Sequence, residues 1–288
     1  MVIRYLLRNW IHRTAQRKVR QSVADAARQH LHTEEPEDAT SDRPAEPCDL
    51  GVVFALGIEA GALEERLSGT VIIRGDGLVV RQGLLQGKRV AIVRCGAGGK
   101  AAAKATEALI SGHQPRWVLA AGLAGGLSAE LKRHDILMVD HLVDTAGNRL
   151  EIDLKVDRES IATLPGVRIG RLLSADRIIR RPDEKLALGR QHDAVAVDME
   201  SFAVAEVCRR RKVPLLAVRV INDTADEELP PDVENLLAQK TKLSQLGAVT
   251  GAVWRRPASV KDMYRLRENA LAASERLAGF LADMVGQL

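Results

Sequence analysis

Two short apolar runs in the second half of the chain each end in carboxylate residues, and this pattern constrains the fold more than any other feature. The run at 195–197 stops at Asp198-Met199-Glu200, and an alanine-rich helical pattern begins directly afterwards. The run at 214–221 ends in Asn222-Asp223. Short apolar runs bounded in this way are typical of buried strands. Since open α/β sheets bind ligands beyond the carboxyl ends of their strands, the pattern predicts an active site there.

From residue 50 onwards, strand-like runs alternate with helix-like stretches. The ranges 50–56, 89–95 and 117–121 are apolar runs, whereas 58–67 and 100–110 fit helices. Such alternation predicts an α/β fold with a central sheet covered by helices on both faces. We expect a single domain over residues 49–288, which is long enough to bury a sizeable core.

The first 48 residues differ in composition from the rest. Six of the 42 lysines and arginines lie within the first 20 residues, with no acidic residue among them. Residues 1–31 interleave these charges with Leu6, Leu7, Trp10 and Ile11, which predicts a basic amphipathic helix. This helix is too short and too interrupted to span a bilayer. We expect the helix to lie on an anionic membrane surface or, alternatively, to pack against the folded domain or another subunit. Residues 32–48 are acidic and proline-rich, so we expect a linker.

Composition also limits the partners. Outside the first 20 residues, 36 basic residues face 38 acidic ones, and this near-neutral balance argues against nucleic-acid binding. The chain has three cysteines, and no two of them have the spacing of metal ligands. We therefore expect neither a disulfide framework nor a cysteine metal site. The histidines form no metal-binding pair, and we expect no metal and no cofactor. The setting that fits is cytoplasmic, with peripheral contact to the inner membrane face if residues 1–31 bind lipid.

Two glycine-rich segments follow predicted strands, Gly96-Ala97-Gly98-Gly99 and Gly122-Leu123-Ala124-Gly125-Gly126. The first also precedes a helix, where backbone N–H groups could meet an anion. Neither matches a dinucleotide fingerprint or a phosphate loop. Tight strand-to-helix turns are therefore an equally good interpretation.

Together with Gly57-Ile58-Glu59-Ala60 after the first strand, these elements follow an order that resembles the nucleoside phosphorylase/nucleosidase superfamily. In particular, residues 50–226 are similar to the methylthioadenosine/S-adenosylhomocysteine nucleosidases. The C-terminal portion is more similar to the hopanoid-associated phosphorylases, which are proposed to remove adenine from a lipid-linked nucleoside. The resemblance implies the nucleoside phosphorylase fold, with a central mixed β-sheet flanked by helices and an N-terminal helical extension. We also expect a homodimer.

The resemblance also implies roles for individual residues. Asp223 matches the acid that protonates the purine, Glu200 the carboxylate that binds the ribose hydroxyls, and Glu59 the base that activates water. The substrate-binding residues that it implies are Met199, Val197, Ile178, Phe202, Asn222, Gly122, Leu123, Ala124 and Gly96. Ile178 replaces the aromatic residue that usually stacks on the base, so Phe202 is a candidate for that contact.

Each acid also has a structural interpretation. Asp223 could cap a helix, Glu200 could favour a helix dipole, and Glu59 could be a solvated helix residue. Three acids at three strand ends, in the family's order, are difficult to produce by capping alone.

The sequence therefore predicts a nucleosidase that hydrolyses the N-glycosidic bond of a 5′-substituted adenine nucleoside. Leu123 stands where phosphorolytic members tend to carry a small hydroxyl residue, which favours water over phosphate. Phosphorolysis, including that of a lipid-linked nucleoside, is the alternative within enzymes. A non-catalytic nucleoside-binding protein is the alternative outside them.

Overall fold

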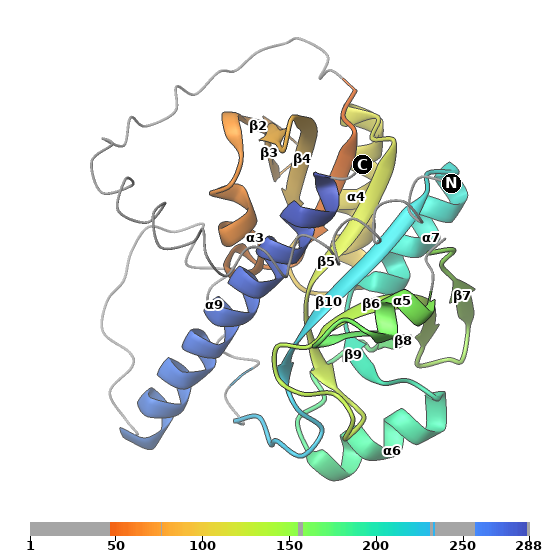
Figure 1. Cartoon of the computed structure of the whole chain (residues 1–288), viewed down its shortest axis with the longest axis vertical. Coiled ribbons are helices and arrows are strands. Elements are labelled where there is room, and N and C mark those ends of the chain that lie inside the picture. Colours follow the sequence, from red (N-terminus) through yellow and green to blue (C-terminus); the bar gives the residue numbers. More distant parts are fainter. Residues whose placement is uncertain (1–46, 76, 155–157, 231–232, 234–256, 287–288) are drawn as a thin grey trace.

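The computed structural model describes residues 47–75, 77–154, 158–230, 233 and 257–286 (Figure 1). The predicted helix at 1–31 and nearly all of the predicted linker lie outside the described residues. Cys48, the residue just before the predicted start of the domain, is buried. Its N–H donates to the carbonyl of His113, and its own carbonyl accepts from the N–H of Arg116.

The described strands form one mixed sheet in which five members close into a ring. In spatial order the path runs β2-β3-β4-β1-β5-β9-β8-β6-β10, and β10 then pairs back onto β5, while β7 adds to β6. The strands are β1 (Leu50–Phe54), β2 (Ser68–Gly75), β3 (Leu78–Leu85), β4 (Lys88–Arg94), β5 (Trp117–Gly126), β6 (Ile136–Asp144), β7 (Arg149–Glu151), β8 (Val167–Ser174), β9 (Ala196–Asp198) and β10 (Leu215–Asp223).

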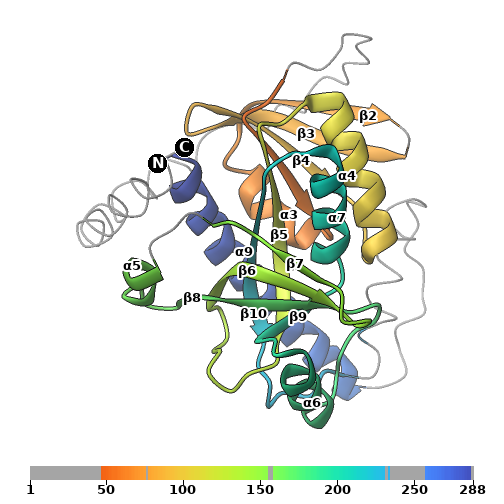
Figure 2. The ribbon, with the colours of Figure 1, turned by 90° about the vertical axis from the view of Figure 1, so that its right-hand side faces the viewer.

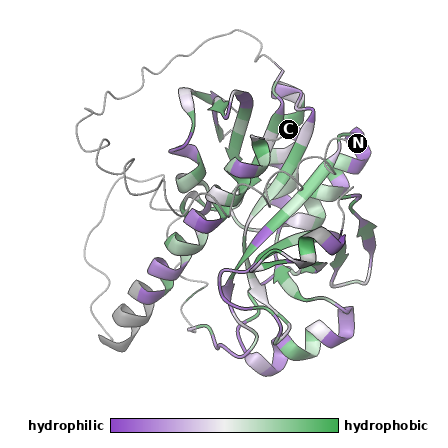
Figure 3. Cartoon of the chain, viewed as in Figure 1, coloured by the Kyte–Doolittle hydropathy of each residue, from purple (hydrophilic) through white to green (hydrophobic). Residues whose placement is uncertain are grey.

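The middle of the sheet is parallel and fully covered. Every residue of β1 is buried, and β1 lies parallel to both β4 and β5. A strand covered on both faces reads as a continuous apolar run without alternation, as LGVVF does. Figure 3 shows hydrophobic residues concentrated in these central strands.

Helices cover the two faces of this sheet. On one face α4 (Gly99–His113) packs against α7 (Ser201–Arg211), and on the other α3 (Gly57–Glu64) packs against α9 (Pro257–Val285) (Figure 2). The short α5 (Arg158–Ala162) and α6 (Pro182–His192) flank the ring. This confirms the predicted α/β fold with a mixed sheet between helices.

The apolar side of α9 has helical spacing. Its fully buried apolar residues lie along one side of the helix, at spacings of one, three or four positions, and small alanines among them let the helix approach α3 closely. They are Ala273, Leu277, Ala278, Leu281 and Val285. Among the described residues, no helix is long and apolar enough to cross a membrane.

We predict that Leu281→Ala lowers the free energy of unfolding by about 2–5 kcal/mol, because it leaves a cavity under α9. Leu271→Ala on the same helix is the control, since Leu271 is 46% exposed, and its cost should stay below about 1 kcal/mol. Urea denaturation measures both values. Equal losses would mean that α9 does not pack on the domain in solution.

Candidate active site

The predicted acids lie at one end of the sheet. Glu59 stands in the first turn of α3, directly after β1, and Asp223 ends β10. β9 runs antiparallel to the last residues of β5, with Val197 opposite Gly125. Asp198, the last residue of β9, and Glu200, two residues beyond it, therefore lie at the same end of the sheet.

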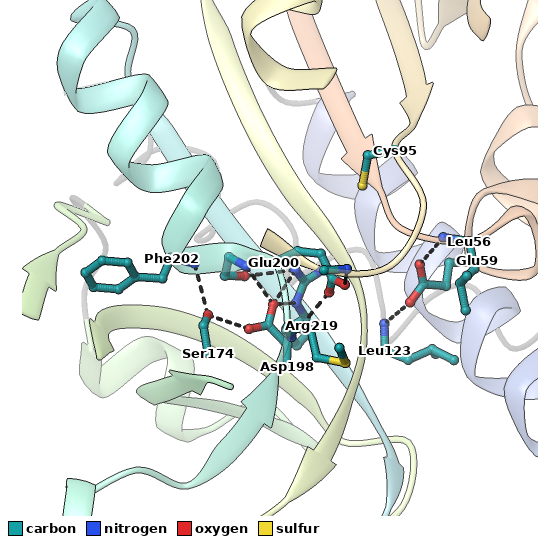
Figure 4. A network of polar contacts seen from close by, with 12 residues as sticks. Leu56, Glu59, Cys95, Leu123, Ser174, Asp198, Glu200, Phe202 and Arg219 are labelled. Atoms are coloured by element: carbon teal, nitrogen blue, oxygen red, sulfur yellow. Dashed lines mark hydrogen bonds and ion pairs between the residues drawn. The ribbon is translucent and has the colours of Figure 1, made fainter. Parts of the chain in front are cut away.

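Glu59 is 5% exposed, and each of its carboxylate oxygens accepts a backbone hydrogen bond. Oε2 accepts from Leu56 N at 2.8 Å, and Oε1 accepts from Leu123 N at 2.9 Å (Figure 4). The first bond fixes the start of α3, and the second ties that helix to β5. The interpretation of Glu59 as a solvated helix residue is therefore wrong.

Glu200 connects α7 to the glycine segment after β4. Its Oε1 accepts from Gly98 N at 2.7 Å, and its Oε2 accepts from Met199 N at 3.3 Å. Although Glu200 stands at the N-cap of α7, its side chain caps no residue of that helix. The glycine amide that could have met a phosphate is thus occupied by a carboxylate of the protein.

A buried arginine lies among these acids. Arg219 of β10 is 3% exposed, and its Nε and Nη2 donate to Asp198 Oδ2 at 3.1 and 2.7 Å. Nη2 also donates to Ser201 Oγ at 2.8 Å. Asp198 accepts further bonds from Ser174 Oγ at 2.6 Å and Ser201 N at 2.9 Å (Figure 4). A buried charge is tolerated when it is paired and hydrogen-bonded in this way.

Gly122 allows the arginine and Glu59 to approach each other across β5. A Cβ at this position would lie 2.7 Å from Arg219 Nη1 and 2.9 Å from Glu59 Oε1. Both distances are shorter than side chains permit, so any side chain here would displace the ends of Arg219 and Glu59. Because β5 extends to Gly126, the interpretation of this glycine segment as a strand-to-helix turn is wrong, and its glycines serve the site.

Asp223 has a different cation. Lys185 of α6 donates from Nζ to Asp223 Oδ2 at 2.6 Å, and Asp223 is 6% exposed. Its carboxylate lies over Gly125, where an added Cβ would approach Oδ2 to 3.1 Å. The interpretation of Asp223 as a helix cap is wrong, because its carboxylate is bound by a lysine.

Burial raises the pKa of all three candidate acids. The pKa of Glu59 is raised by desolvation, against the bond from Leu123 N and the charge of Arg219. The pKa of Glu200 rises to about 7, through desolvation and then the charge of Asp198. The pKa of Asp223 is raised by desolvation, which Lys185 opposes. Carboxyl groups whose pKa is raised by burial are suited to proton transfer.

The other predicted residues fall into two groups. Val197 contacts the same point over Gly125 as Asp223, since its Cγ1 would lie 3.5 Å from an added Cβ. The ring of Phe202, in contrast, belongs to the core and points away from Glu200 and Arg219 (Figure 4). Gly96 has a positive φ of 85°, and the remaining predicted residues are the buried Ala124 and the half-buried Met199, Leu123, Ile178 and Asn222.

The sequence reasoning missed Arg219, Asp198, Ser174 and Lys185. Arg219 left a signal, because it is a single charge inside an otherwise apolar strand, and such a residue needs a buried acid as partner. Asp198 stood in the quoted motif without a role. Lys185 gave no such signal in the sequence, because it lies in an amphipathic helix with several other charged residues.

A mixed sheet that gathers buried acids beyond its strand ends defines an α/β enzyme of the phosphorylase type. The chain belongs to the Phosphorylase superfamily, whose family model matches residues 49–249. It is 27% identical over 216 residues to a 5′-methylthioadenosine/S-adenosylhomocysteine nucleosidase of Staphylococcus haemolyticus. That alignment covers 68% of this chain and 95% of the relative.

Solved structures share the fold. A Helicobacter pylori 5′-methylthioadenosine/S-adenosylhomocysteine nucleosidase mutant, with 5′-methylthioadenosine in its active site, aligns with a TM-score of 0.65 at 21% identity, covering 84% of this chain and 99% of that one. The futalosine hydrolase of Helicobacter pylori aligns with a TM-score of 0.64 at 20% identity, covering 85% and 99%. These likenesses confirm the predicted fold, and the family model confirms the predicted family.

We predict that Glu200→Gln flattens the dependence of stability on pH. In the folded protein the pKa of Glu200 is raised to about 7, whereas the ordinary pKa of a glutamate, which applies to the unfolded chain, is 4.5. The folded state therefore binds this proton more tightly than the unfolded chain, so this stabilisation is complete below about pH 4.5 and is lost as pH rises through 7. The loss should reach about 3 kcal/mol, at roughly 1.4 kcal/mol for each pH unit.

Denaturation of the unliganded protein between pH 4 and pH 8 measures this difference. Glu206→Gln is the matched control, because Glu206 is an exposed acid on the same helix. A Glu200→Gln variant that follows the wild-type curve would place the Glu200 pKa in its ordinary range.

Proposed function

We propose that the protein hydrolyses the N-glycosidic bond of an adenine nucleoside with a substituted 5′ position. The observation that carries this proposal is the set of three acids at one end of the sheet, the buried Glu59 and Asp223 and the half-buried Glu200, each held by specific partners. Glu59 and Glu200 flank Arg219, and Asp223 binds Lys185. The relatives named above support the same bond and the same class of substrate.

The three acids suit three parts of this reaction. Cleavage builds positive charge on the sugar and negative charge on the departing base. Glu200, beside the ribose, stabilises the cationic sugar and accepts bonds from its hydroxyls. Glu59 takes the proton of the attacking water, and Asp223 gives a proton to the base. A raised pKa lets a carboxyl hold the proton that it must donate near neutral pH.

Two contacts favour water over phosphate as the nucleophile. Gly98 N–H, the amide at the start of α4, already donates to Glu200. Arg94, the arginine nearest to this segment, is bound to Glu64 through Nε at 2.8 Å and through Nη2. Neither group is therefore free to hold a phosphate, which supports hydrolysis over the phosphorolytic alternative.

Purified protein incubated with methylthioadenosine should release adenine at the same rate with and without phosphate. We predict that Glu59→Gln lowers this rate by a factor of about 10² or more, since the water loses its base. Nucleoside binding, measured by calorimetric titration, should remain.

The control is Glu65→Gln, an exposed acid at the end of the same helix, which should leave the rate unchanged. Dependence of the rate on phosphate would instead support phosphorolysis. Lost binding in the Glu59 variant would move this residue to a binding role.

We also propose that residues 1–31 hold the enzyme at anionic membranes in the cytoplasm, and that the protein is a homodimer. Six basic residues among apolar ones support the first proposal, since each contributes about 1 kcal/mol near such a surface.

Full-length protein should sediment with phosphatidylserine-containing vesicles and be released by high salt. Deleting residues 1–46 should abolish sedimentation and leave methylthioadenosine cleavage intact. Full-length protein that ignores these vesicles would contradict this proposal.

A further inference from the structure

Lys185 is a charged residue with no solvent contact. Its exposed fraction is 0%, and all three protons of its ammonium group are used. Nζ donates to Asp223 Oδ2 at 2.6 Å, to the carbonyl of Thr224 at 2.9 Å and to the carbonyl of Glu227 at 2.8 Å. The two carbonyls belong to the turn directly after Asp223. Lys185 therefore fixes both this carboxylate and the backbone that carries it.

Burial of the Lys185 ammonium group is unfavourable for the free energy of folding. An ammonium group in a protein interior loses its hydration, and an apolar residue of similar size often gives an equally stable fold. The other aspartate, glutamate and arginine side chains of the helix that carries Lys185 remain accessible. The contact with Asp223 is what distinguishes Lys185 from them.

The two oxygens of Asp223 are in different situations. Oδ2 is bound by Lys185 and lies against Gly125. Oδ1 accepts no hydrogen bond from the part of the chain that the structure describes. One oxygen thus anchors the group, and the other is left for a ligand.

Building on the function proposed above, we propose that Lys185 is a positioning residue for the reaction. It anchors Asp223 through Oδ2, leaves Oδ1 to deliver the proton to the departing base, and stabilises the carboxylate that this transfer leaves behind.

The proton and the electrons balance without another reactant. The electron pair of the bond between the sugar carbon and the base nitrogen passes to the base, and a ring nitrogen takes the proton from Asp223 Oδ1. The water oxygen bonds to the sugar carbon, and its proton goes to Glu59. Asp223 then regains a proton from solvent and Glu59 releases one. The ammonium of Lys185 keeps its protons throughout.

Three charged residues near Asp223 influence its pKa. Lys185 faces it from α6, Arg133 from the segment before β6, and Glu227 from the turn after β10. Arg133 and Glu227 form an ion pair with each other, so they largely cancel. Lys185 is therefore the cation with the largest effect on Asp223. Burial raises the pKa of this carboxyl, and the charge of Lys185 lowers it, which makes Asp223 a stronger acid.

Removal of the lysine charge should change the pH profile as well as the rate. Asp223 is the group that must be protonated, so its ionisation forms the alkaline limb of kcat/KM. We expect Lys185→Met and Lys185→Gln to move this limb upward by roughly 1–2 pH units, the scale of one adjacent charge. Both should also lower kcat by about 10-fold or more, because a weaker acid donates its proton less readily. Lys185→Arg, which keeps the charge, should keep the limb in place.

Further variants separate this role from simple folding. Arg181→Gln removes an exposed charge at the start of the same helix, where Arg181 pairs with Asp183, and it should leave the limb unchanged. On an Asp223→Asn background, Lys185→Gln should cause little further loss of kcat, since the residue acts through Asp223. A ¹³C carboxyl resonance, assigned to Asp223 by its loss in Asp223→Asn, should titrate at higher pH in Lys185→Gln than in the wild type.

If the wild type cleaves nucleoside and neither the limb nor the carboxyl titration moves in Lys185→Met or Lys185→Gln, the proposal is overturned. A full additional loss on the Asp223→Asn background would also overturn it. A wild type that cleaves no nucleoside would instead refute the proposed function, and the carboxyl titration would then still decide whether Lys185 governs Asp223.

Discussion

The guanidinium of Arg219 makes the rest of the site possible. Asp198, Glu200 and Glu59 crowd into one desolvated region, and their mutual repulsion adds to the cost of burying each of them. Arg219 donates directly to Asp198 and lies near the other two. The arginine is itself held by the rigid pairing of β10 with β5 and β6. Backbone bonds from Gly98, Leu56 and Leu123 satisfy the remaining carboxylate oxygens. The charges are thus fixed before any substrate arrives.

The ring of strands explains why these groups meet at all. β10 lies between β5 and β6, and β9 pairs with the end of β5 from the other side. The last residues of both strands therefore converge on the glycine segment of β5. Gly122 and Gly125 have no side chains, and Glu59, Arg219 and Asp223 occupy the space that a Cβ would need. The side chains of the site therefore pack directly on the backbone of β5.

The site has two halves with separate cations. Arg219 serves the acids assigned to the sugar and the water, whereas Lys185 serves the acid assigned to the base. Separate cations let each half be tuned independently, because the charge that favours an ionised Glu59 does not also bind Asp223 directly. A proton donor and a proton acceptor can then coexist at one pH, which a single shared charge would not allow.

The sequence by itself determined the elements and the acids. Apolar runs and terminal carboxylates are local patterns, so β1, β10, the first half of β5 and the positions of Glu59, Glu200 and Asp223 could be predicted, whereas the continuation of β5 through the glycine segment could not. The tertiary structure alone decided which cation serves which acid. Lys185 and Asp223 are 38 residues apart in the chain, and Arg219 and Asp198 are 21 apart. Such pairs depend on strand register and on burial, because a charge seeks a partner only after packing has removed its water.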